Sequence, residues 1–262
     1  MCEAPICGGI RESTSPKVID SSRLPRGPVS YKYIEVGKTL YQAPCVETPR
    51  FSAKAAYVML RELLRDPATP TTIYDPFCGN GVLLVTALLS FASRVNSLLG
   101  SDLHPFAVRS CQMNLSWLRE EGALQSRIQT IQAYQTEDRQ LKAIYAERCR
   151  LMFAHARDIQ TGTTVFQHDA RRIASVLSSM AETVAIVTDP PYTRPPPGQT
   201  DPDFGLLEPF LSQVAKAPNV SCLMLCYQRG TPVLPLLERY FTVCEKRGTR
   251  SRNIYFCKRR PN

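Results

Sequence analysis

The sequence predicts an α/β fold in which a mostly parallel sheet of seven strands carries helices on both faces. Short runs rich in β-branched residues alternate with stretches of helical length over most of the 262 residues. Such alternation is typical of a parallel sheet that is covered on both sides. Hydrophobic residues make up 44% of the chain, which is enough for the core of one domain of this length.

The elements follow one another in a regular order from residue 52 onward. The first helix begins at Ser52, a good N-cap residue, and ends before Pro67. The expected helices are residues 52–65, 81–93, 105–121, 171–180 and 206–216. The expected strands are residues 71–75, 97–102, 164–169, 184–189, 220–227, 241–246 and 253–258. The last two strands should pair across a turn at Gly248.

Two segments fall outside this order. Between the second and third strands the chain is longer than one crossover helix requires, so we expect a helical insertion at about 120–160. With seven Lys and Arg against six Asp and Glu over residues 118–158, it is either a solvated helical hairpin or an arm that recognises the substrate. Residues 1–40 are rich in Pro, Ser and Gly, and we expect a flexible tail ahead of a domain at 41–262. One face of the insertion would carry Leu141, Ile144, Tyr145 and Met152.

Composition narrows the class of protein. No apolar run reaches the roughly 20 residues that a membrane helix needs, and the N-terminus lacks the apolar segment of a secretory signal, so we expect a cytoplasmic protein. The ten cysteines include no CxxC pair and no Cys/His set with zinc-like spacing, so we expect reduced thiols and no metal. The net charge of +9 favours a polyanionic partner, although a basic protein without such a partner carries the same charge.

The motif DPFCGNG at 75–81 lies between an expected strand and an expected helix. In a doubly wound sheet, ligands bind beyond the carboxyl ends of the strands, which is where Asp75 is placed. Gly79 and Gly81 allow a tight turn and a close approach of the backbone to a ligand, and the next helix presents unpaired N–H groups. The expected ligand contacts in this motif are Asp75, Pro76, Gly79, Asn80 and Gly81.

A second acid, Asp102, ends the next strand, 27 residues farther along the chain (102 − 75). A carboxylate at that place accepts hydrogen bonds from both hydroxyls of a ribose, a feature shared with enzymes that bind NAD. The GxGxxG pattern of NAD enzymes is incomplete, because Leu83 and Leu84 follow Gly81. The pattern instead resembles the first motif of class I methyltransferases, which use S-adenosylmethionine, and Asp102 and Leu103 are then the expected nucleoside contacts.

A third acid ends the third expected strand, within FQHDA at 166–170. In class I methyltransferases an acid at this place, or its backbone neighbour, contacts the adenine. The resemblance therefore assigns Asp169 and Ala170 to the cofactor. A helix N-cap is the alternative role for Asp169.

The segment TDPPYT at 188–193 resembles the [D/N/S]PP[Y/F/W] motif of amino-methyltransferases, and its Asp form indicates a nucleobase substrate. If the methylated atom is an exocyclic amine, Asp189 and the Pro190 carbonyl accept its hydrogens and localise the lone pair. If it is a ring nitrogen, Asp189 accepts the proton instead. Stacking of a base on Tyr192 is worth roughly 1–3 kcal/mol. The expected catalytic residues are Asp189, Pro190, Pro191 and Tyr192.

Basic residues gather near the C-terminus. Residues 239–262 hold eight Lys and Arg against one acid, Glu245. Such a cluster either contacts phosphates or is merely solvated. Arg194 and the loop 195–203 follow the DPPY turn, where they could shape a pocket for the base.

From about residue 40 onward the chain resembles the AviRa family of rRNA methyltransferases. The resemblance rests on the place of the insertion and on QAPCVETPR (42–50), IYDPFCGNGVLLVTALL (73–89), GSDLHPFAV (100–108), TDPPYTR (188–194) and GTRSRNIYFCKR (248–259). It implies a Rossmann-like class I fold, S-adenosylmethionine as cofactor, a monomer, and a guanine of large-subunit rRNA as substrate. The family's turn is DLPY, and the DPPY of this chain is nearer to enzymes that methylate exocyclic amines. The expected RNA contacts are Arg50, Arg194, Lys246, Arg247, Arg250 and Arg252.

Four other functions fit parts of the sequence. A DNA amino-methyltransferase would usually carry a target-recognition domain, and nothing beyond the short insertion could serve as one. A tRNA guanine-N2 enzyme often carries an RNA-binding module, for which residues 1–40 are poorly suited. An RNA-binding protein without catalysis would not need an intact DPPY turn, and a nicotinamide-dependent oxidoreductase would need the GxGxxG pattern.

Overall fold

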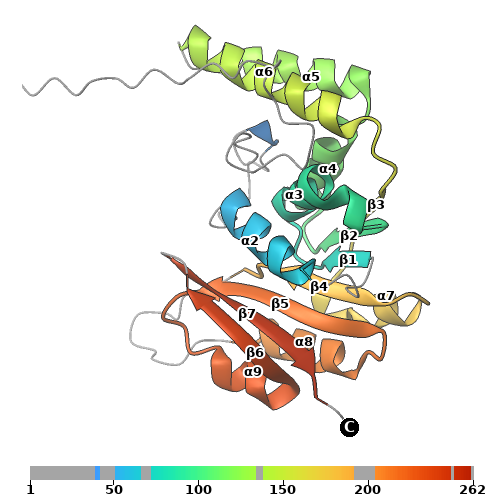
Figure 1. Ribbon diagram of the computed structural model, residues 1–262, viewed down its shortest axis with the longest axis vertical. Helices are drawn as coiled ribbons and strands as arrows, with labels where there is room; N and C mark the ends of the chain where they lie inside the picture. Colours follow the sequence, from blue (N-terminus) through green and yellow to red (C-terminus); the bar gives the residue numbers. More distant parts are fainter. Residues whose placement is uncertain are drawn as a thin grey trace, which may run out of the picture.

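The computed structural model describes residues 39–41, 51–65, 72–133, 138–191, 204–248 and 251–260. Its centre is a seven-stranded sheet in the order β3-β2-β1-β4-β5-β7-β6 (Figure 1). The strands are β1 (Thr72–Asp75), β2 (Ser97–Asp102), β3 (Gly162–Gln167), β4 (Val184–Thr188), β5 (Val220–Gln228), β6 (Phe241–Gly248) and β7 (Arg252–Arg259). Strands β1 to β5 are parallel, and β7 lies antiparallel between β5 and β6. The predicted Rossmann-like fold is confirmed.

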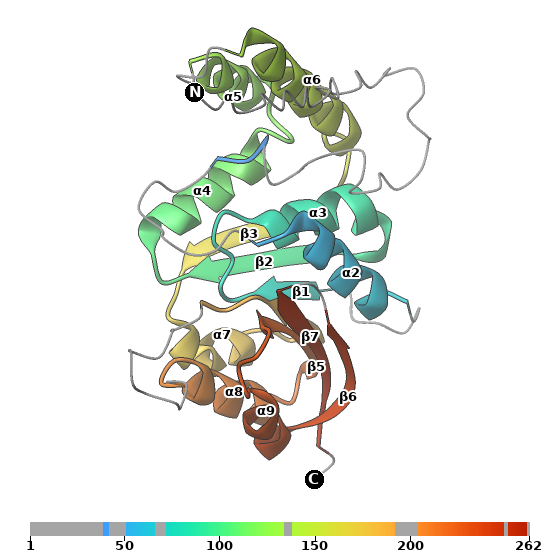
Figure 2. The same cartoon turned by 90° about the vertical axis from the view of Figure 1, so that its left-hand side faces the viewer.

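Helices cover both faces of this sheet (Figure 2). One face packs against α2, α3 and α4 in a core that the insertion extends, and the other face packs against α7, α8 and α9. The helices are α2 (Ala53–Leu63), α3 (Val82–Phe91), α4 (Pro105–Ser116), α5 (Glu121–Gln132), α6 (Arg139–Ala156), α7 (Ala174–Ser178), α8 (Leu207–Lys216) and α9 (Leu234–Tyr240). Two short 3-10 turns, η2 (Ala92–Arg94) and η3 (Ala170–Arg172), complete the described elements.

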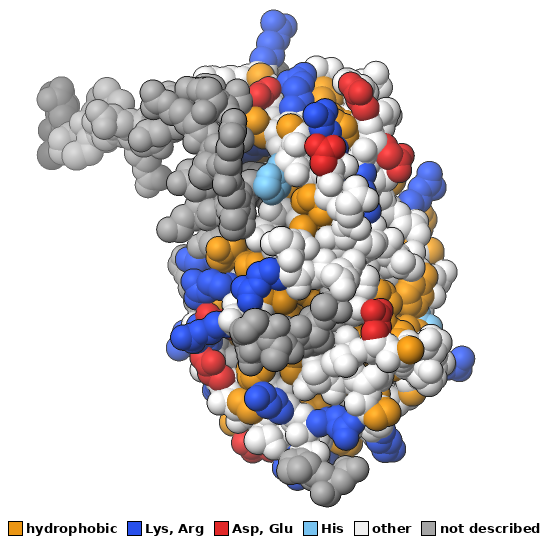
Figure 3. Space-filling model, turned by 45° about the vertical axis from the view of Figure 1, so that its right-hand side comes forward, with side chains coloured by type: hydrophobic (Ala, Val, Ile, Leu, Met, Phe, Trp, Pro, Cys, Tyr) orange, Lys and Arg blue, Asp and Glu red, His pale blue; other side chains and the backbone are white. Residues whose placement is uncertain are grey.

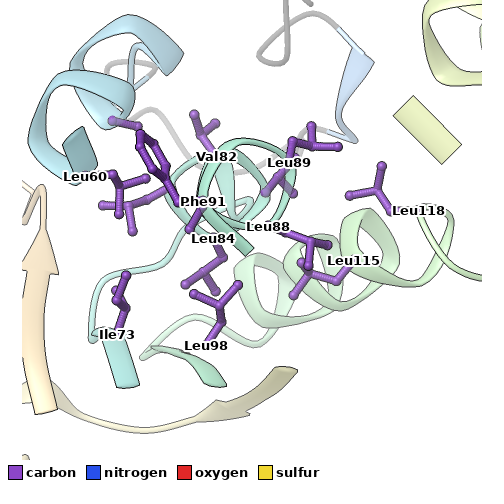
Figure 4. Close-up of a cluster of buried hydrophobic side chains, with 14 of the residues drawn as sticks. Leu60, Ile73, Val82, Leu84, Leu88, Leu89, Phe91, Leu98, Leu115 and Leu118 are labelled. Carbon is purple, nitrogen blue, oxygen red and sulfur yellow. The ribbon is translucent and has the colours of Figure 1, made fainter. Parts of the chain in front are cut away.

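Helix α3 lies at the centre of the larger core (Figure 4). All ten of its residues are buried, because its sequence VLLVTALLSF is apolar on every side. Its one internal threonine, Thr86, satisfies its hydroxyl by donating to the carbonyl oxygen of Val82 at 2.7 Å. The helix therefore fixes the DPFCGNG loop, which directly precedes it, against a rigid support.

The predicted insertion consists of two helices, α5 and α6, which lie side by side beyond α4 (Figures 1 and 2). It is more than a solvated hairpin, because Ile128, Ile131, Cys149 and others are buried in the larger core. Of the predicted apolar face, Met152 is buried, whereas Leu141, Ile144 and Tyr145 are half-buried.

The structure differs from the expected elements in several places, and α4 ends at Ser116 rather than at residue 121. Helix α9 was not predicted, because two prolines in TPVLP suggest a loop. Pro235 lies in the first turn of α9, where no backbone N–H is needed for the helix. Strand β3 begins and ends two residues before its expected bounds. Within the described ranges, no helix is long and apolar enough to cross a membrane.

Candidate active site

Three acids meet at the carboxyl edge of the sheet. Asp75 ends β1 and Asp102 ends β2, whereas Asp189 directly follows β4. Since β1 lies between β2 and β4, the three carboxyl groups come from neighbouring strands at the point where the strand order reverses. Their proximity is felt electrostatically, because both Asp102 and Asp189 raise the pKa of Asp75.

Asp75 is the innermost of these acids, with 4% of its surface exposed. Its Oδ1 accepts hydrogen bonds from the Thr188 hydroxyl at 2.6 Å and from the Phe77 backbone N–H at 3.2 Å. Burial raises the pKa of this carboxyl to about 7, against the opposing effect of the two hydrogen bonds. Asp75 can therefore hold or release a proton near neutral pH.

The loop between β1 and α3 depends on two glycines. Gly79 has φ +52° and Gly81 has φ +83°, a left-handed conformation that other residues rarely adopt. A Cβ at Gly81 would lie 2.6 Å from Cys111 Sγ, whereas a Cβ at Gly79 would meet nothing within 4 Å. Gly81 thus packs against α4, and Gly79 faces open space at the edge of the sheet.

Asp102 holds this loop with one carboxylate oxygen and its own following residues with the other. Its Oδ2 accepts a hydrogen bond from the Gly79 N–H at 3.0 Å, and its Oδ1 accepts one from the His104 N–H at 2.9 Å. The side chains of Leu103 and Phe106, which follow it, are 58% and 53% exposed. The predicted nucleoside contacts Asp102 and Leu103 therefore lie beside the glycine loop.

A segment that was not predicted also reaches the loop. We call residues 39–41 the strap. The Asn80 side chain donates to the Tyr41 carbonyl oxygen at 3.3 Å, and the buried Asn114 side chain donates to the carbonyl oxygens of Tyr41 at 3.1 Å and Asn80 at 2.8 Å. On the other side, Arg127 of α5 donates to Thr39 O at 2.7 Å and to Leu40 O at 3.0 Å. The strap therefore connects the insertion to the loop.

Asp169 lies two residues beyond β3, where it caps the short turn η3. Its Oδ1 accepts from the Arg171 backbone N–H at 2.9 Å, and its Oδ2 pairs with the Arg171 guanidinium at 2.7 Å. These bonds lower the pKa of Asp169. The N-cap role is confirmed, and a cofactor contact by this side chain or by the buried Ala170 stays a prediction.

The DPPY turn begins at Asp189, whose carboxylate forms an ion pair with Arg252 on β7. Each of the two side chains is only 9% exposed. Pro190 is buried and Pro191 is exposed. Tyr192 and Arg194 lie outside the described residues.

The structure corrects the prediction that Arg252 contacts RNA. It was expected among surface cations that contact RNA, but it is buried, and its guanidinium lies 5.4 Å from the ring centre of Phe51. The cause is the topology, because β7 runs inside the sheet and its first residue pairs with Gln228 of β5. Arg252 is therefore part of the site around Asp189 and not of the outer surface.

The other expected RNA contacts divide into two groups. Lys246 is exposed, whereas Arg247 is half-buried and forms ion pairs with Glu62, at 2.8 Å, and Glu245. Arg50 and Arg250 lie outside the described residues, as does Arg194. Figure 3 shows that Lys and Arg side chains are spread over the visible face rather than gathered in one patch.

Among the residues whose positions the structure gives, no group of three or more His, Cys, Asp or Glu side chains could hold a metal ion. The expectation of no metal stays a prediction.

Comparison with known proteins decides the family. Residues 29–229 match the family described as rRNA methyltransferase AviRa. The chain belongs to this family. A curated relative from Streptomyces viridochromogenes, named 23S rRNA (guanine(2535)-N(1))-methyltransferase, is 31% identical over 235 residues, which are 82% of this chain and 87% of the relative.

Solved structures agree on the fold of this AviRa-family chain. The rRNA methyltransferase AviRa of S. viridochromogenes matches with a TM-score of 0.64 at 20% identity, over 92% of this chain and 94% of that one. The 16S rRNA N2 G1207 methyltransferase of T. thermophilus, solved with AdoMet and guanosine, matches with a TM-score of 0.50 at 16% identity, over 83% of this chain and 45% of that one. The predicted class I methyltransferase fold is thus shared with enzymes of known structure.

Sequence reasoning missed two polar residues of this methyltransferase, Asn114 and Arg127, and gave a third, Arg252, a surface role. Asn114 and Arg127 both lie on otherwise apolar helix faces, between buried residues such as Cys111 and Leu115 or Leu124 and Ile128. A polar residue on an apolar stripe was the available signal for both. Arg252 had no such signal, because several arginines surround it in the sequence.

Proposed function

We propose that the chain transfers a methyl group from S-adenosylmethionine to a guanine of large-subunit rRNA. The observation that carries this proposal is the place of Asp189. In a chain of the AviRa family, this acid lies at the strand-order reversal, beside the glycine loop that Asp75 and Asp102 hold. Membership of the family supports the reaction, and the site supplies groups suited to it.

The residues present fit the proposed cofactor. The space that a Cβ would fill at Gly79 is open, so a ligand can approach the backbone of the loop closely. Asp102 and the exposed Leu103 would hold the ribose and adenine, with Asp169 and Ala170 near the base and Pro76, Asn80 and Gly81 shaping the loop. When bound, S-adenosylmethionine supplies a methyl group on a cationic sulfonium. The carboxyl group of Asp102, together with Asp75 when it is ionised, favours such a cation at this sheet edge.

For the substrate, we propose the ring nitrogen N1 of guanine. The relative at 31% identity is named for this atom in 23S rRNA. N1 carries a hydrogen, and its lone pair is delocalised, so it becomes nucleophilic only when it loses the proton. Asp189 would accept that proton, while Tyr192 stacks on the base after it has left its helix. Arg50, Arg194, Lys246 and Arg250 would contact the RNA backbone.

The alternative is an exocyclic amine of guanine or adenine in tRNA or DNA. The DPPY sequence of the turn favours it, since the buried Pro190 offers a carbonyl oxygen next to the Asp189 carboxylate. Product analysis separates the two, because methylation at N1 and at N2 gives different nucleosides after digestion of the RNA.

We further propose that the enzyme works as a monomer in the cytoplasm, on naked or partly assembled rRNA. The seven cysteines within the described ranges are free thiols, as is typical of a reducing compartment.

The test is methyl transfer from tritiated S-adenosylmethionine to purified RNA fractions and ribosomal subunits. We expect label in large-subunit RNA, and about a 10²- to 10⁴-fold lower rate for Asp189→Asn, because the proton acceptor is lost. Asp158→Asn is the matched control, since Asp158 is exposed at the end of α6. Tight cofactor binding without label in any RNA would refute the RNA substrate, and an active Asp189→Asn would refute the role of the turn.

A further inference from the structure

The buried ion pair between Asp189 and Arg252 joins the DPPY turn to the antiparallel end of the sheet. Asp189 follows β4 and Arg252 begins β7, and β5 lies between these two strands. Cys226 of β5 lies beside the pair, because both residues shift the pKa of its thiol, which burial raises most. A charged pair at this depth requires both partners, since either one alone would be a desolvated charge.

We propose that Arg252 determines which nitrogen of the base is methylated, favouring a ring nitrogen that ionises over an exocyclic amine. This inference rests on the proposed function. Arg252 acts through Asp189 as a positioning residue: it holds the carboxylate oriented and ionised, and it balances the negative charge that forms on the base.

The charges account for this role. When a ring N–H gives its proton to Asp189, the electron pair of that bond stays on the base, and the carboxylate becomes neutral. The ring nitrogen then forms a bond to the methyl carbon as the carbon–sulfur bond breaks, with its electron pair going to sulfur. The negative charge has moved from Asp189 to the base, and the same guanidinium stabilises it in both places. Asp189 releases its proton to water when the product leaves.

Methylation of an exocyclic amine develops charge of the opposite sign on the base. Its nitrogen attacks while it still carries its hydrogens, so positive charge builds on the nitrogen before a proton is lost. A buried guanidinium close to that nitrogen raises the energy of this transition state. The sign of the charge on Arg252 therefore favours the ring nitrogen and disfavours the amine.

The following neighbours of the pair, all within the described residues, agree with this preference. Asp75 on β1 and Asp102 on β2 lie on the side of Asp189 away from Arg252, because β1 and β2 precede β4 in the strand order. Both are acids, and Asp102 and Asp189 raise the pKa of Asp75. Cys226 stays a neutral thiol because burial raises its pKa, and the ring of Phe51 is apolar. Relative to these neighbours, which come from β1, β2, β5 and the residue Phe51 ahead of α2, Arg252 supplies the positive charge next to the carboxylate.

The experiment compares wild type with Arg252→Gln and Arg252→Lys. The pH dependence of kcat/KM is measured on large-subunit rRNA, and the methylated nucleoside is identified after digestion. We expect wild type to produce N1-methylguanosine. Arg252→Gln should lose about 10²-fold in kcat at neutral pH, and its pH–rate profile should move upward by at least about one unit because ionisation of the base is no longer assisted. Arg252→Lys keeps the charge and should recover most of the activity.

Binding of S-adenosylmethionine to each variant shows whether the fold is intact, and Arg239→Gln on α9 is the control for an exposed arginine. An unchanged pH profile in a folded Arg252→Gln overturns the inference, as does N2-methylguanosine as the wild-type product. If Arg252→Gln does not fold, Arg252→Lys decides, because it keeps the positive charge. A folded Arg252→Lys should keep the wild-type pH profile and the N1-methylguanosine product, and an upward-moved profile or an N2-methylated product refutes the role. Absence of any methyl transfer by wild type is a separate result, which refutes the proposed function itself.

Discussion

At the scale of single residues, Asp75 shows what a buried carboxyl group costs in folding stability. Its carboxyl is buried at the end of β1, and burial raises its pKa from 3.8 to about 7. Between these values the folded protein keeps a proton that the unfolded chain releases. The contribution of Asp75 to stability therefore falls as pH rises from about 4 to about 7, and the full cost is present above that range.

Replacing Asp75 by Asn should remove this cost, because Asn keeps the acceptor for Thr188 and carries no charge. We expect Asp75→Asn to raise the free energy of unfolding at pH 8 by on the order of 4 kcal/mol at most. The gain should shrink towards zero near pH 4. Chemical denaturation at a series of pH values measures it, and Asp158→Asn should show no such window. A gain that is independent of pH would contradict the explanation.

The sequence predicted the positions of some site residues well and of others not at all. Asp75, Asp102 and Asp189 could be placed because each follows a recognisable strand, and the carboxyl ends of parallel strands share one edge. The burial of Arg252 could not, because it depends on β7 lying between β5 and β6. Strand order among antiparallel strands is set by long-range pairing, which local sequence does not reveal.

At the scale of elements, the turn from β1 to α3 contains two glycines that are required for different reasons. Both have positive φ, but only Gly81 lies against a neighbour, the Cys111 side chain of α4. The two positions therefore separate the cost of backbone conformation from the cost of packing.

We expect Gly79→Ala to lower the free energy of unfolding by about 1–2 kcal/mol, the cost of a left-handed conformation. Gly81→Ala should lower it by at least about 1 kcal/mol more, because its Cβ would also overlap Cys111 Sγ. Urea denaturation of the two variants makes the comparison. Equal losses would mean that α4 moves away from the new methyl group without cost.

The predicted elements were right where the hydrophobic pattern agreed with the glycine and proline residues that mark the ends of helices and strands. Strand β2 has its expected bounds, and α3 was recognisable because a run of ten mostly apolar residues follows two glycines. Helix α9 was hidden because its prolines suggest a loop, although the first turn of a helix tolerates them. The strap was beyond prediction, since its contacts come from α5, which lies more than 80 residues away in sequence.

At the scale of the whole molecule, the net charge is +9, and on the face seen in Figure 3 the Lys and Arg side chains are spread rather than gathered in one patch. Arg247 and Arg252 are engaged with acids of the chain itself. Exposed cations such as Lys246 remain available to phosphates. Composition could predict a polyanionic partner, but it could not tell these two kinds of basic residue apart.

RNA affinity should therefore fall steeply with salt. We expect the slope of log K against log salt concentration to decrease by about 0.7–0.9 in Lys246→Ala, for one lost phosphate contact. Arg252→Gln should leave the slope unchanged, because its guanidinium is buried. Filter binding over a range of salt concentrations measures both slopes. A lower slope for Arg252→Gln would mean that Arg252 contacts a phosphate of the RNA and would contradict its assignment to the buried site.

The strap gives the molecule a property that neither the insertion nor the loop has alone. Arg127 of α5 holds its carbonyl oxygens, and Asn80 in the loop donates to its last residue, so the two elements share one hydrogen-bonded path. Where two sites are coupled, the coupling free energy is reciprocal. To whatever degree a ligand at Asn80 steadies α5, a molecule that docks on α5 and steadies it must tighten the binding of that ligand by the same factor.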